Sequence, residues 1–149
     1  MIDVEHTIID RVKTILAIAR KNLLETGSQL PMAILHTFEG VFPIVLPFKD
    51  VDQKQALIEF VKDQALEKQA FAVSTITCAK IVDSRTGENE ESIVIATAVQ
   101  GGRPYYASQS YVRGPDRQVL SFGEEVEGDS AATPGQMMIL PEWDLETRH

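Results

Sequence analysis

Two residues able to take part in nucleophilic chemistry, one histidine and one cysteine, occur in stretches typical of β-strands. His36 alternates with Ile34 and Phe38, and Cys78 alternates with Ile76. Nucleophilic catalysis needs a base within hydrogen-bond reach of the nucleophile and a third group that orients the base. We expect a core or edge histidine and a small buried cysteine. The alternative is an enzyme or small-ligand binder with a pocket near His36 and Cys78, between the second helix and the sheet.

The spacing of the other reactive residue types predicts no metal site, no cofactor and no catalytic residue. His6, His36 and His149 are far apart, and the chain has neither His-x-x-x-His nor Cys-x-x-Cys. Gly101-Gly102 lies between two predicted strands, where a hairpin turn accounts for both glycines. The acidic runs at 88–91 and 124–129 lack the alternating ligands of a calcium loop.

The most unusual stretch runs from Arg103 to Arg117. It contains all three tyrosines and three of the seven arginines. Arg and Tyr interleaved on a strand can anchor a protein partner or stack on single-stranded nucleic acid, and cross-strand pairing within a sheet is the structural alternative. The candidate partner-binding residues are Arg103, Tyr105, Tyr111, Arg113 and Arg117.

Hydrophobic spacing predicts two helices. Apolar residues recur every three or four positions after Asp3 and stop at Gly27, and a second helix starts at Asp50 and ends near Ala70. The first helix carries further apolar residues beside its main stripe, at positions 9 and 18. That width favours either a broad core face or a symmetric dimer contact.

Between and after the helices, the pattern predicts strands. Residues 31–48 read as two short strands around a tight turn, and the prolines at 43 and 47 favour a second strand that lies at a sheet edge or ends early. From residue 71 the period becomes two, which predicts an antiparallel meander over 71–82, 92–100, 103–113 and the segment around 119–122.

Together these elements predict one α+β domain over residues 1–149, in the order α-β-β-α-β-β-β-β. We expect both helices on one face of a mainly antiparallel sheet, as a two-layer sandwich. Residues 124–136 are acidic and rich in small residues, which predicts a loop, and the apolar segment 137–143 should dock on the domain.

Composition and charge narrow the function classes. The chain of 149 residues is 44% hydrophobic and 24% charged, and its single cysteine excludes an intramolecular disulfide. Its net charge is −8, concentrated in residues 124–149, and this charge disfavours nucleic acid as a partner. The acidic opening and the lack of a long apolar run favour a cytoplasmic protein without a membrane segment.

The layout resembles a group of small bacterial and phage proteins of uncharacterised function. The resemblance rests on Leu30–His36, Phe38-Glu39-Gly40, Val45–Phe48, the strands at 71–82 and 92–100, and the closing Pro141-Glu142-Trp143. That group has no assigned catalytic residue, so the resemblance implies none here. The element order is also similar to roadblock and profilin-like folds, which often serve as dimerising scaffolds.

These observations favour a non-enzymatic protein-interaction or accessory module that binds a protein partner or itself. A small-ligand binder or enzyme is the first alternative. The second alternative is an accessory protein that binds single-stranded nucleic acid through Arg103, Tyr105, Tyr111 and Arg113.

Overall fold

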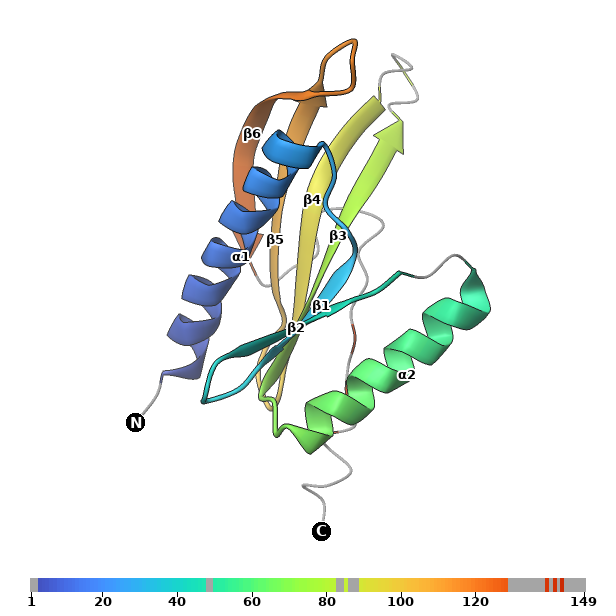
Figure 1. The fold of residues 1–149 in the computed structure, drawn as a ribbon. Coiled ribbons are helices and arrows are strands. Elements are labelled where there is room, and N and C mark those ends of the chain that lie inside the picture. Colours follow the sequence, from blue (N-terminus) through green and yellow to red (C-terminus); the bar gives the residue numbers. More distant parts are fainter. Residues whose placement is uncertain are drawn as a thin grey trace.

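The computed structural model describes residues 3–47, 50–82, 85, 89–128, 139, 141 and 143. These residues form two helices and six strands in the predicted order, which confirms the α+β class (Figure 1). The elements are α1 (Val4–Thr26), β1 (Met32–His36), β2 (Val41–Val45), α2 (Val51–Glu67), β3 (Ala72–Val82), β4 (Asn89–Val99), β5 (Tyr105–Arg113) and β6 (Val119–Gly128).

The helix ends follow the capping residues in the sequence. The Asp3 carboxylate accepts a hydrogen bond from the first turn of α1, and Gly27 ends that helix in the left-handed conformation, with φ of 80°. The Asp50 carboxylate accepts from the backbone N–H of Gln53, at 2.8 Å, and starts α2. Helix α2 ends at Glu67, slightly before the predicted end.

All strand pairs are antiparallel, and the strand order across the sheet is β2-β1-β3-β4-β5-β6. The edge position predicted for the proline-containing strand is confirmed for β2. Strand β6 continues to Gly128. The prediction of a loop from residue 124 is therefore wrong for 124–128, because this segment pairs with β5; residues 129–136 lie outside the described residues.

The two helices pack on opposite faces of the sheet, so the expectation of helices on one face is wrong. One buried cluster joins α1 to Ile34, Ile76 and Ile95, and a second joins α2 to Leu35 and Val73. Successive residues of a strand point to opposite faces, so neighbours such as Ile34 and Leu35 belong to different cores. The central strands are buried on both sides for this reason.

The described residues after β6 pack on the α2 side. Ile139, Pro141 and Trp143, all within the expected docking segment 137–143, are buried, and the indole Nε1 of Trp143 donates to the carbonyl of Ala70 at 3.0 Å. This hydrogen bond satisfies the polar atom of a side chain that is otherwise enclosed by apolar groups. Neither described helix is both long and apolar enough to cross a membrane.

Candidate functional site

A groove of about 470 Å³ lies between α1 and the β1–β2 hairpin. Its floor and walls are mainly apolar, and polar side chains from α1 and the following loop line its ends. This volume and character are typical of sites that take apolar groups. The lining residues are Asp10, Arg11, Thr14, Ile15, Ile18, Asn22, Gln29, Met32, Ile34, Gly40, Val41, Pro43 and Ile76.

Helical and strand periodicity explains why these residues meet. Residues at 11, 15, 18 and 22 share one side of α1 because they recur every three or four positions. Met32 and Ile34 alternate along β1, and Val41 and Pro43 alternate along β2, so all four side chains point to the α1 side of the sheet. The groove runs along α1 for about 16 Å from Arg11 to the position of residue 22.

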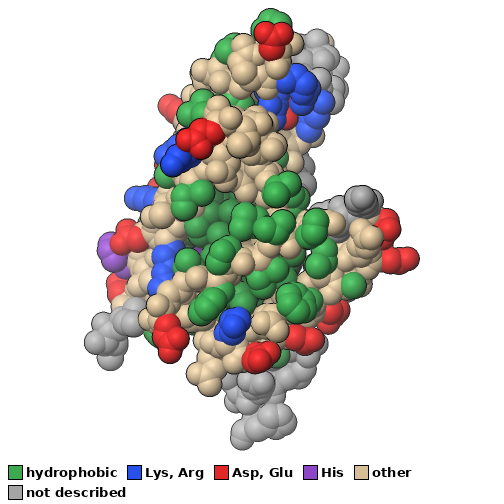
Figure 2. All heavy atoms as spheres, viewed as in Figure 1, with side chains coloured by type: hydrophobic (Ala, Val, Ile, Leu, Met, Phe, Trp, Pro, Cys, Tyr) green, Lys and Arg blue, Asp and Glu red, His purple; other side chains and the backbone are tan. Residues whose placement is uncertain are grey.

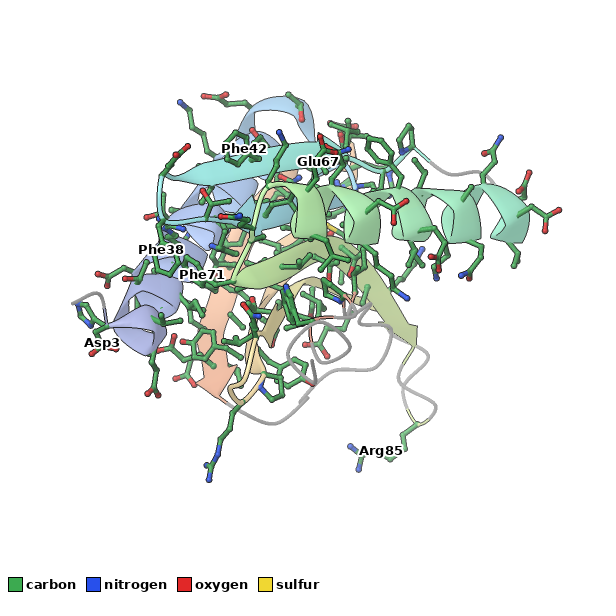
Figure 3. All side chains as sticks on the ribbon, turned by 90° about the horizontal axis from the view of Figure 1, so that it is seen from below. Asp3, Phe38, Phe42, Glu67, Phe71 and Arg85 are labelled. Carbon is green, nitrogen blue, oxygen red and sulfur yellow. The ribbon has the colours of Figure 1, made fainter. Side chains whose placement is uncertain are left out.

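Arg11 closes one end of the groove by fastening α1 to the hairpin turn. Its guanidinium donates to the carbonyl of Thr37 at 3.0 Å and to that of Gly40 at 3.5 Å, and it lies 5.7 Å from the centre of the Phe71 ring. Phe38, in the turn, packs against Phe71 with ring centres 4.8 Å apart, and Figure 3 shows the two labelled rings together. This end of the groove is therefore fixed by contacts within the protein.

The other end is closed by an amide pair. The side-chain nitrogen of Asn22 donates to Gln29 Oε1 at 2.8 Å, and Gln29 Nε2 donates to the carbonyl of Leu30 at 2.8 Å. Gln29 is buried, so these hydrogen bonds offset the loss of its hydration. Arg11 at one end of the groove and Asn22 and Gln29 at the other thus form hydrogen bonds within the protein. The middle section of the groove is mainly apolar.

The apolar lining of the groove is open to solvent and continues past the groove at one residue of β2. Ile18 and Val41 of the lining are 54% and 46% exposed, and Val45, outside the lining, is 44% exposed. Figure 2 shows hydrophobic side chains gathered around a hollow in the viewed face, between α1 and α2. Contiguous exposed apolar surface of this kind marks interaction sites on proteins. We call the groove lining together with Val45 the groove face.

The groove face borders the open edge of β2, and Pro43 modifies that edge. The backbone N–H of Leu46 donates to the carbonyl of Pro31 at 2.9 Å, so even-numbered residues of β2 pair with β1. The alternation of an antiparallel ladder then directs the backbone groups of Val41, Pro43 and Val45 outward. Pro43 has no N–H and its ring occupies that place, which hinders addition of another strand.

His36 is fully buried on the α1 side of the sheet. Its Nε2 lies 2.8 Å from Ser74 Oγ, which lies 2.6 Å from Thr97 Oγ1, whereas Nδ1 has no partner among the described residues. Burial, and secondarily the charge of Arg11, lower the pKa of His36 to about 4. His36 is therefore a neutral core residue at pH 7. It faces away from α2, next to Ile34 of the groove rather than in its lining.

Cys78 is exposed, so the expectation of a small buried side chain is wrong. It lies beyond Ile76 toward the end of the sheet, where α1 no longer covers β3. Partial desolvation still raises the pKa of its thiol, and the hydroxyl of Tyr111 lies beside it. His36 pairs with Ala72, and Cys78 lies six residues farther along β3, which is about 20 Å. His36 and Cys78 are therefore too far apart to form a catalytic dyad.

The five predicted partner-binding residues between positions 103 and 117 do not lie together in the structure. Tyr111 is 3% exposed, and Arg113 pairs with Glu91 at 2.8 Å. The Arg113 guanidinium also donates to the carbonyl of Arg117, at 2.7 Å, within the turn before β6. Arg117 is exposed, and its left-handed backbone conformation, with φ of 65°, forms part of this turn. These three residues form cross-strand and turn contacts and do not form one exposed platform.

Arg103 and Tyr105, the other two candidates, line a second cavity of about 730 Å³ near the start of α1. The Tyr105 hydroxyl donates to Glu127 of β6, and burial together with this carboxylate raises the tyrosine pKa. Tyr105 and Tyr111 are six residues apart on one strand, or about 20 Å. Sequence reasoning therefore grouped residues that belong to two ends of the sheet.

The sequence pattern contained only partial signals for the groove. Ile18 widened the apolar stripe of α1, and Pro43 marked an edge strand, but neither showed that the two elements lie side by side. Among the described residues, no cluster of three or more histidine, cysteine, aspartate or glutamate side chains could hold a metal ion. No protein-family model, curated protein or solved structure matches this chain.

Proposed function

We propose that this protein is a non-enzymatic interaction module that binds a partner protein through the groove face. The observation that carries the proposal is the exposure of Ile18 and Val41 in the groove lining together with that of Val45 outside it. A small molecule would contact the groove lining alone, whereas a protein partner would also cover Val45 outside it.

The chemistry of the groove supports binding rather than catalysis. Its described lining contains no histidine or cysteine, and Arg11, Asn22 and Gln29 are engaged in hydrogen bonds within the protein. Apolar side chains of a partner would therefore supply the binding energy, at about 25 cal/mol per Å² of apolar surface removed from water. Pro43 disfavours a partner that adds a strand to β2, which leaves side-chain docking as the mode of contact.

Native mass spectrometry tests this proposal on protein purified gently from its own host. We expect a second, different chain in the complex. The variant Val41→Glu should lose that chain, because a charge would be buried against the partner. Val112→Glu is the matched control, since Val112 is 57% exposed on β5, away from the groove lining.

Two results would contradict the proposal: a chain with no other protein bound, or equal retention of the partner by both variants. Retention of a molecule of a few hundred daltons, lost in Val41→Glu, would favour the second candidate function. That candidate is binding of a small apolar ligand, and it is supported by the groove volume of about 470 Å³, which is within the usual range for such sites.

A further inference from the structure

The outer face of α1 carries a second stripe that is separate from the core and borders the groove, whose lining includes Asp10 and Thr14 of the stripe. Asp10, Thr14, Ala17 and Lys21 are all exposed. At about 100° per residue these four positions fall within an arc of about 60°, so they form one line along the helix. Small side chains occupy the middle of the line, and opposite charges occupy its two ends.

We infer that this stripe is a self-association surface on which α1 of a second copy packs antiparallel about a twofold axis. An axis midway between Thr14 and Ala17 places each threonine opposite the alanine of the other copy. Small residues at this position allow two helix backbones to approach closely. The Thr14 hydroxyl donates to the Asp10 carbonyl of its own helix, at 3.2 Å, so its proton already has an acceptor within the monomer.

Charge complementarity selects a second copy as the occupant. The same axis places Asp10 of each copy opposite Lys21 of the other, because both residues are equally distant from the axis. Two opposite-charge contacts form per dimer by symmetry, and a parallel arrangement would instead place like charges together. The molecule has a net charge of −8, but these two residues sum to zero, so the contact itself is not repulsive.

The exposed apolar residue beside the stripe supports the same arrangement. Ile18 is 54% exposed and lies on the groove side of the stripe, close to the proposed axis. A twofold axis perpendicular to the two helices brings both copies of Ile18 to the same side of the contact. Each copy then covers apolar surface that the monomer leaves in water.

Analytical ultracentrifugation of the full chain tests this inference. At about 50 µM chain we expect a species of twice the 16.5 kDa chain mass, as for a Kd in the micromolar range. Asp10→Lys and Lys21→Glu should each weaken dimerisation about tenfold or more, because each creates two like-charge contacts. The double variant Asp10→Lys/Lys21→Glu should restore the dimer, because the two positions exchange their charges and opposite charges again face each other.

Asp63→Lys is the control for net charge, because Asp63 is exposed on α2 and the change equals that of Asp10→Lys. Circular dichroism should show folded protein for every variant. A monomeric wild-type chain at this concentration would overturn the inference, as would a dimer that the single reversals leave unchanged or that the double variant fails to restore. The dimer contact shares Asp10, Thr14 and Ile18 with the groove face, so the groove partner should compete with the dimer. Val41→Glu lies outside these shared residues and should leave the dimer intact, which separates the two tests.

Discussion

Acidification from pH 7 to pH 5 is expected to remove about 2 kcal/mol of folding free energy through His36 alone. The folded protein holds this imidazole in its neutral form, with a pKa of about 4 against the ordinary 6.5. Its Nδ1 has no acceptor for a proton among the described residues, and Arg11 adds a nearby positive charge. Protonation therefore favours the unfolded chain.

The sign and the pH range follow from the lowered pKa. The stabilising contribution is fully present above pH 6.5, where both states are neutral at this residue, and it is lost as the pH falls from 6.5 towards 4. Each pKa unit corresponds to about 1.4 kcal/mol, so the full effect is about 3 kcal/mol below pH 4.

Urea unfolding at pH 7 and pH 5 measures this effect, with circular dichroism as the signal. His36→Gln keeps a donor near Ser74 but does not titrate, so its stability should fall about 2 kcal/mol less than that of the wild type over this pH change. The control is His6→Gln, because the His6 side chain is exposed and pairs with Asp10 of the same helix.

Equal pH dependence of the wild type and His36→Gln would refute the reasoning. If that variant fails to fold, NMR titration of the imidazole in the wild-type protein gives the same information. A His36 signal that titrates near pH 6.5 in the folded protein would contradict the lowered pKa and with it the predicted loss of stability.

Three further predictions follow from single contacts. Pro43→Val should restore a donor on the open edge of β2 and cause concentration-dependent association, measured by light scattering; an unchanged mass would show that the proline does not protect this edge. Arg11→Met should lower the free energy of unfolding by about 1–3 kcal/mol in urea titrations, because two carbonyls lose a charged donor, and Arg11→Lys should recover part of it. Trp143→Phe should cost about 1 kcal/mol by removing the hydrogen bond to Ala70, and no change would mean that this bond contributes little.

The element order could be predicted because it depends on local signals. Asp3, Gly27 and Asp50 cap their helices as expected, and Pro43 lies on an edge strand. These residues act through backbone geometry and nearby hydrogen bonds, which sequence spacing contains directly. The end of the last strand was harder to predict from the sequence. Pairing with β5 extends β6 through an acidic segment that has weak strand propensity by itself.

The arrangement of the layers could not be predicted, because it depends on which neighbours each face of a strand meets. The stretch from Phe71 to Ile76 has its two polar residues, Ser74 and Thr75, side by side rather than at every second position, and this pattern fits a strand covered on both faces as well as a short core strand. Cys78 continues the same face but lies beyond the cover of α1. Strand parity therefore assigns a residue to a face without telling how far the opposing helix reaches.

The central sheet acts as a partition between two separately packed interiors. Residues of the α1 core and the α2 core alternate along β1 and β3, yet each set contacts its own helix. Substitutions in the two interiors should then have nearly additive effects on stability, because they share few direct neighbours. Evolution can therefore vary the groove side of the molecule while the side that holds Trp143 keeps its packing, and new binding preferences can arise without rebuilding the whole fold.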